Sequence, residues 1–166
     1  MQTMEKAQVS LPSDREVRVT RGFNAPRTLV YKAWTTPALL QRWMLGPPGW
    51  SMPVCEMDVR VGGKYRWRWR SDADGKEFGF SGVFREVAAP TRLVNTELYD
   101  PGDVGGDMGG EALLVTEFTE KNGVTTMTCL ITYASKADRD AALSTGMTDV
   151  MEMSYQLLDA LLTTDH

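Results

Sequence analysis

Polar and apolar residues alternate clearly near the start of the chain. Residues 15–21 alternate charged with small apolar side chains, which is the period of a strand with one buried face. Residues 1–14 show no such period, and we expect a mobile tail ahead of a single domain of residues 15–166. Pro26 suits the first position of a helix, and Pro37 breaks that helix and starts a second short one that runs to Trp43.

The middle of the chain predicts six further strands. Gly62-Gly63, residues 72–75 and residues 121–123 have turn composition. Between such turns, the strand-like stretches lie at residues 52–59, 64–70, 78–89, 93–99, 112–119 and 124–133. Residues 100–110 have neither period nor bulk, and we expect a flexible loop there that could admit a ligand.

A long amphipathic helix is predicted at the end of the chain. Ser135 suits an N-cap, and an apolar stripe follows at helical spacing. A helix over residues 136–162 would be roughly 40 Å long. We expect Met147, Met151 and Leu158 to face a sheet. The element order therefore predicts an α+β helix-grip fold, in which a curved antiparallel sheet surrounds a long C-terminal helix in the order β-α-α-β6-α.

Composition limits the classes of partner. Lys and Arg total 18 against 22 Asp and Glu, and the net charge of -4 disfavours nucleic acid as a partner. The sequence contains neither a secretory apolar segment nor a membrane span, so we expect a cytoplasmic protein that does not bind a membrane. Cys55 and Cys129 lack the spacing of a metal or redox motif and are expected to be free thiols.

Several short motifs resemble those of the heat shock protein 90 ATPase activator-like family of the START-like (SRPBCC) superfamily. They are Ala25-Pro26, Ala33-Trp34-Thr35, Arg42-Trp43, Gly63-Lys64-Tyr65-Arg66, Pro90-Thr91-Arg92-Leu93-Val94, Arg139-Asp140 and Gly146-Met147. The resemblance covers about residues 15–162 and implies a pocket between the sheet and the last helix. Met44-Leu45 and Val150-Met151 replace tryptophan-containing pairs that are common in the family, which predicts pocket walls richer in methionine.

Catalytic chemistry is restricted by the histidine content. The only histidine is His166, so the usual Ser-His-Asp, Cys-His and His-ligated zinc sites are disfavoured. Glu97 is the best remaining candidate for a general base and shares a strand face with Leu93 and Tyr99. We expect this face to point to solvent.

Two charged patterns invite a functional interpretation. Asp103, Asp107 and Glu111 offer oxygen ligands, but their spacing matches no calcium motif, and we predict neither a metal nor a cofactor. Basic residues alternate with aromatic ones over residues 64–70, which is typical of the solvent-facing side of a sheet.

Aromatic and methionine residues supply the strongest functional signal. The predicted ligand-binding residues are Trp43, Trp50, Tyr65, Trp67, Trp69, Phe78, Phe80, Phe84, Glu97, Met147, Met151 and Tyr155. Among them, Trp43 and Trp50 are expected near the mouth of the pocket.

Three functions remain open. The first is a binding protein for a small hydrophobic or aromatic molecule without obligatory catalysis. The resemblance implies two alternatives, a co-chaperone-like module that contacts a heat shock protein 90 type ATPase and a polyketide-cyclase-like enzyme. The oligomeric state is also open, a homodimer included.

Overall fold

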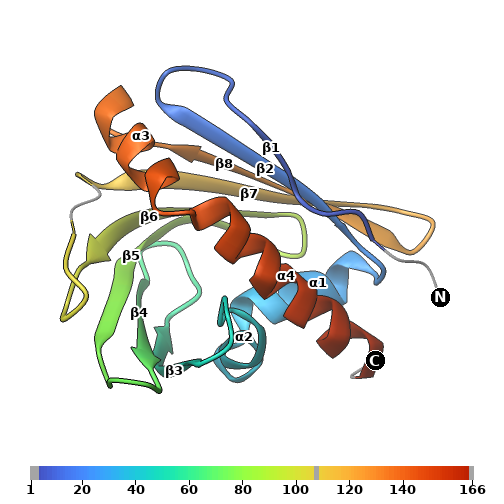
Figure 1. Ribbon diagram of the computed structural model, residues 1–166. Coiled ribbons are helices and arrows are strands. Elements are labelled where there is room, and N and C mark those ends of the chain that lie inside the picture. Colours follow the sequence, from blue (N-terminus) through green and yellow to red (C-terminus); the bar gives the residue numbers. More distant parts are fainter. Residues whose placement is uncertain (1–3, 107–108, 165–166) are drawn as a thin grey trace.

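A curved antiparallel sheet encloses one long helix in the computed structural model, which describes residues 4–106 and 109–164 (Figure 1). The strands run in the spatial order β1-β2-β8-β7-β6-β5-β4-β3. Their bounds are β1 Gln8–Ser10, β2 Glu16–Phe23, β3 Trp50–Met57, β4 Lys64–Ser71, β5 Glu77–Ala88, β6 Arg92–Asp100, β7 Ala112–Lys121 and β8 Val124–Thr132. β1 lies at one edge of the sheet, and β3 lies at the other edge.

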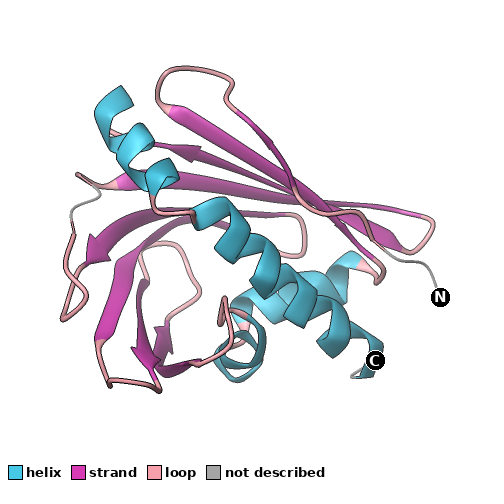
Figure 2. Cartoon of the chain, in the orientation of Figure 1, coloured by secondary structure: helices cyan, strands magenta, loops and turns pink. Residues whose placement is uncertain are grey.

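The helices lie on the concave side of the sheet (Figure 2). They are α1 Arg27–Thr35, α2 Pro37–Trp43, α3 Lys136–Ser144 and α4 Met147–Thr164. Pro37 occupies the start of α2, as the sequence predicted, and Ser135 caps α3 by accepting a hydrogen bond from the Asp138 N–H at 3.0 Å. This arrangement confirms the helix-grip, START-like fold. None of the described helices is long and apolar enough to span a membrane.

Two sequence predictions about the ends of the chain are wrong. Residues 8–10 form β1 and pair with residues 18–20 of β2, so part of the expected mobile tail is sheet. The expected single helix over residues 136–162 is divided into α3 and α4. Gly146 lies between them with a φ of 79°, a conformation that glycine adopts readily and that ends a helix.

The core is formed by the inner face of the sheet and the helices that cover it. Val17, Val19 and Phe23 of β2 are fully buried and alternate with outward residues, as the period of this strand predicted. Leu158 of α4 is also fully buried, and Met147 and Met151 pack against the same core. The expectation that the methionine stripe faces the sheet is therefore confirmed.

The pairing of β5 with β6 shifts register between Phe84 and Glu86 and is interrupted just before that shift. Ser81 pairs with Leu98 and Phe84 pairs with Asn95, but the two residues between them on each strand are not paired. The Val83 N–H instead donates to Oγ1 of Thr96 at 2.9 Å, and the Tyr65 hydroxyl donates to the Thr96 carbonyl at 2.5 Å. Side chains thus satisfy backbone groups that a regular ladder would pair.

Candidate functional site

A small cavity of about 60 Å³ lies between the inner face of the sheet and the first turn of α4. Its lining combines three aromatic rings, a thioether, a carboxyl group and two small residues: Phe80, Tyr99, Tyr133, Met147, Glu97, Gly110 and Ala112. An apolar cavity with few polar groups is the usual form of a small-molecule site.

Strand register brings these residues together from distant parts of the sequence. Phe80 on β5 is opposite Tyr99 on β6, and Glu97 on β6 is opposite Ala112 on β7. Tyr133 directly follows β8, and Met147 is the first residue of α4 after the break at Gly146. The break between α3 and α4 therefore determines where Met147 meets the residues of the sheet.

Glu97 is the charged residue of the cavity lining. Its side chain lies on the inner side of β6, so the expectation that this strand face points to solvent is wrong. Burial raises the pKa of the carboxyl group from 4.5 to about 7, and no hydrogen bond or neighbouring cation among the described residues opposes this shift. Glu97 therefore exchanges a proton near neutral pH.

The two tyrosines of the cavity have different hydrogen-bond partners. The Tyr99 hydroxyl donates to the Gly105 carbonyl at 2.7 Å. This hydrogen bond connects Tyr99 to the loop that follows β6. The Tyr133 hydroxyl contacts the Met147 sulfur at 3.4 Å, and a thioether is a weak acceptor. Burial raises the pKa of Tyr133, with a further contribution from the Glu97 charge, so this phenol stays protonated and can donate to a ligand.

Gly110 closes one side of the cavity. Its N–H donates to Oδ2 of Asp138 near the start of α3 at 3.1 Å. A side chain at the preceding Gly109, whose φ is 80°, would collide with the Asp138 carboxylate. The described part of the loop after β6 is thus held against α3.

Most of the predicted aromatic residues form one cluster on β3, β4 and β5. Trp69 stacks on Phe78 with ring centres 5.5 Å apart, and Phe80 continues the cluster to Tyr99 at 5.4 Å. The other predicted rings joined to this cluster by close contacts are Trp50, Tyr65, Trp67 and Phe84. Of the predicted residues, Phe80, Glu97 and Met147 line the cavity itself.

Trp43 and Tyr155 belong to a different aromatic cluster. Their ring centres are 6.3 Å apart, and both contact Trp34 of α1. Trp43 is fully buried and donates from Nε1 to the Ala33 carbonyl at 3.0 Å, so its predicted position at a pocket mouth is wrong. Pro37 directs α2 so that this ring packs into the core between helices.

Sequence reasoning missed four lining residues, Tyr99, Gly110, Ala112 and Tyr133. A usable signal existed for two of them. Tyr99 lies two residues after Glu97 and therefore on the same strand face, and Tyr133 continues the inward positions of β8. Gly110 and Ala112 carry no chemical signal, because their contribution is to leave space.

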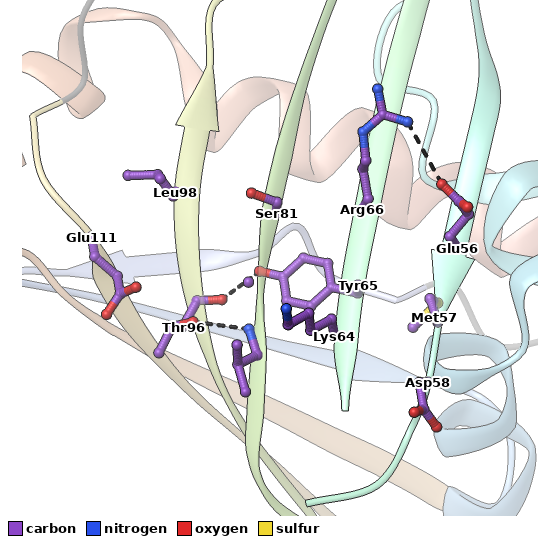
Figure 3. A pocket seen from close by; sticks show the side chains of 12 residues that line it. Glu56, Met57, Asp58, Lys64, Tyr65, Arg66, Ser81, Thr96, Leu98 and Glu111 are labelled. Carbon is purple, nitrogen blue, oxygen red and sulfur yellow. Dashed lines mark hydrogen bonds and ion pairs between the residues drawn. The ribbon is translucent and has the colours of Figure 1, made fainter. Parts of the chain in front are cut away.

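A second depression of about 650 Å³ lies on the opposite, outer face of the sheet (Figure 3). It is open and lined by charges of both signs, including Glu56 and Arg66, which form an ion pair at 3.6 Å. Arg68 likewise pairs with Glu77 and Asp100, at 3.0 and 2.7 Å. Arg66 and Arg68 of β4 therefore form ion pairs on the outer side, as expected for the solvent-facing side of a sheet.

The acidic residues whose calcium interpretation was rejected from their spacing, Asp103, Asp107 and Glu111, are not all described. Asp107 lies outside the described residues, as does His166. Among residues 4–106 and 109–164, no group of three His, Cys, Asp or Glu side chains could hold a metal ion. Asp103 instead accepts a hydrogen bond from the Glu77 N–H at 3.2 Å.

The sheet, the gripped helix and the internal cavity define a START-like protein. Residues 24–163 match the family model described as activator of Hsp90 ATPase homolog 1-like protein. The chain belongs to this family. No curated protein sequence matches the chain.

Solved structures show the same fold. A protein from Rhodobacter sphaeroides is 31% identical with a TM-score of 0.87, over 96% of this chain and 99% of the other. A protein from Mycobacterium smegmatis is 24% identical with a TM-score of 0.82, over 99% of both chains. An AHSA1-like protein from Aeromonas hydrophila is 20% identical with a TM-score of 0.68, over 90% of this chain and 96% of the other.

Proposed function

We propose that this protein binds a small, largely apolar molecule in the cavity between the sheet and α4. The observation that carries the proposal is the lining itself, in which Phe80, Tyr133 and Met147 surround a single carboxyl group. Apolar walls with a few converging polar groups favour a ligand that has an apolar body and one polar end. Methionine adds a deformable wall that can adjust to the ligand.

The neighbouring aromatic cluster adjoins the cavity through one shared ring. Phe80 belongs both to the cavity lining and to this cluster, where it contacts Trp69 at 5.9 Å. Trp67 lies in the same cluster, and its Nε1 is buried without a hydrogen-bond partner among the described residues. An unpaired buried donor is costly, and a ligand acceptor would satisfy it.

Tryptophan emission tests this proposal directly. A hydrophobic probe should change the emission saturably, because Trp67 and Trp69 adjoin the proposed site. Replacing Ala112, which is 5% exposed, by leucine should weaken this response because the added carbons occupy the cavity. Ala137→Leu adds the same volume at an exposed position of α3 and should leave the response unchanged. Equal responses in both variants would contradict the proposal.

Membership of the Hsp90 activator-like family supports a second candidate, contact with a chaperone ATPase through the protein surface. This function would not need the cavity. A pull-down with the chaperone of the host, performed with the wild type and Ala112→Leu, separates the two. Capture of the chaperone by both proteins, together with no probe binding to the wild type, would favour the chaperone contact.

A further inference from the structure

The cavity contains a carboxyl group that has no positively charged partner in the described part of the chain. Among residues 4–106 and 109–164, no Lys, Arg or His lines the cavity, and burial raises the pKa of Glu97. The buried arginines of the described chain are engaged elsewhere. Arg21 pairs with Glu152 and Asp159, while Arg139 pairs with Asp140 and donates to the Ser13 carbonyl. The described lining residues therefore supply no counter-ion for Glu97.

The groups that interact electrostatically with Glu97 are neutral at pH 7. They are Tyr65 from β4, Cys129 from β8 and Tyr133 after β8, and burial raises the pKa of each. From α4, the residue that contacts the cavity is Met147, which does not titrate. Glu97 is thus the titrating group of the cavity near neutral pH.

We propose that the cavity binds the ammonium group of an organic amine, with Glu97 as its counter-ion and the rings of Phe80, Tyr99 and Tyr133 around it. This inference rests on the proposed ligand-binding function and names the class of ligand. Aromatic faces attract a cation, and a desolvated site strengthens that attraction. The cavity would hold about four heavy atoms, which suits a small alkylammonium group, and the apolar tail would extend along Phe80 toward Trp69.

Charge also determines which ligands are rejected. A carboxylate placed in the cavity would face the Glu97 carboxylate without an intervening cation, so fatty acids and aromatic acids are disfavoured. An alcohol of the same shape could donate one hydrogen bond but would leave the half-buried Glu97 charge without a counter-ion. The order of affinity for ligands of one shape should therefore be amine, then alcohol, then acid.

Proton exchange by Glu97 gives the inference a second readout. An alkylamine stays protonated throughout the neutral range, as lysine does. Below about pH 7, binding of the ammonium group requires Glu97 to lose its proton, so the apparent affinity should rise with pH and level off above that value. A neutral alcohol should show no such rise.

The test is an NMR titration of the folded full-length protein with n-butylamine, 1-butanol and butyrate at about pH 8. The amine should shift the amide signals of Glu97, Gly110 and Ala112 saturably, with an affinity at least about tenfold above that of the alcohol. Butyrate should not bind. Glu97→Gln should lower the affinity for the amine at least about tenfold and leave that for the alcohol unchanged.

Two further variants separate the effect of surface charge from that of the aromatic rings around the cavity. Glu111→Gln removes an exposed carboxylate from the next segment and should bind the amine like the wild type. Phe80→Leu removes one ring of the cage and should weaken amine binding several-fold while Glu97 is retained.

The outcomes separate this inference from the proposed function. Equal binding of amine and alcohol, or full amine affinity in Glu97→Gln, would overturn the amine inference and leave an apolar site in place. Amine-induced shifts confined to Glu56 and Asp58 on the outer face would also overturn it. If n-butylamine, 1-butanol and a hydrophobic probe all fail to bind, both proposals are wrong.

Discussion

Arg21 of β2 donates two hydrogen bonds to Asp159 of α4, both 2.8 Å long. The same guanidinium donates to Glu152, about two helical turns earlier in α4, at 3.1 and 3.0 Å. Its side chain is 2% exposed and lies over the rings of Phe23 and Tyr155. One buried cation therefore holds the middle of α4 against β2.

Removing one acid of this ion pair should destabilise the protein. Glu152→Gln should lower the free energy of unfolding by about 1 to 3 kcal/mol, because Glu152 is 13% exposed and accepts two hydrogen bonds from Arg21. Asp159→Asn should cost less, since Asp159 is 33% exposed and partly solvated. Urea denaturation at neutral pH measures both, and a larger loss for Asp159→Asn would contradict this account.

The ion pair between Arg21 and Glu152 also predicts how stability changes at acidic pH. Burial would raise the pKa of Glu152, but hydrogen bonds from Arg21 and its neighbours outweigh it and lower the pKa below its usual value. The associated stability is thus present above the unfolded-state pKa of about 4.3 and is lost as the pH falls through the lower folded-state value. In Glu152→Gln, stability should fall less steeply in this acidic range. A slope equal to that of the wild type would exclude the contribution of Glu152.

Glu97 should have the opposite effect on stability. Burial raises the folded-state pKa of Glu97 from 4.5 to about 7. Its contribution to stability is therefore fully present below the unfolded-state pKa and is lost as the pH rises through the folded-state pKa. Glu97→Gln removes this loss and should gain about 1 to 3 kcal/mol relative to the wild type between about pH 5 and pH 8. Urea denaturation across that range checks the gain, and a constant difference between the two proteins would contradict it.

Gly146 should tolerate side chains poorly for conformational reasons. A Cβ atom there would meet nothing within 4 Å, but the φ of 79° is unfavourable for other residues. Gly146→Ala should therefore lower stability by about 1 kcal/mol, whereas Gly146→Asn should cost less because asparagine adopts this conformation more readily. Thermal unfolding of the two variants measures the difference. Equal stability of alanine and wild type would show that the break between α3 and α4 needs no glycine.

The thiols should react at different rates in the folded protein. Both cysteines are free, and burial raises the pKa of Cys55 to about 11 and that of Cys129 to about 12. Cys55 is half-buried, so it should react first with a disulfide reagent at about pH 8, and buried Cys129 should react after unfolding. Fewer than two thiols in the unfolded, unreduced chain would contradict this prediction.

The fold could be predicted from local sequence patterns because each pattern controls an element directly. The alternation in β2 gives a strand with one buried face, and Pro37 at the start of α2 follows from the geometry of proline. The break at Gly146 was missed because an isolated glycine inside an apolar stripe is compatible with a continuous helix. β1 was missed because it is short and exposed, and its formation depends on pairing with β2.

The candidate site could be predicted less completely because it depends on register. Phe80 and Met147 were included for their chemistry, but their meeting with Tyr99 depends on the pairing of β5 with β6 and on the position of the helix break. Strand period places Glu97 and Tyr99 on one face without showing which face is buried. Trp43 was assigned to the site by residue type alone, although the packing of α2 buries it in a separate cluster.

A crystal structure of the freshly purified protein tests the central claim most directly. Ligand binding predicts ordered non-protein density in contact with Phe80, Tyr133 and Met147, and mass spectrometry of an extract from the same preparation should give a molecule of matching size. Soaking with n-butylamine should give density beside the Glu97 carboxylate. Side chains packed without a cavity at this position, together with no bound molecule in the extract or the soaked crystal, would contradict the account.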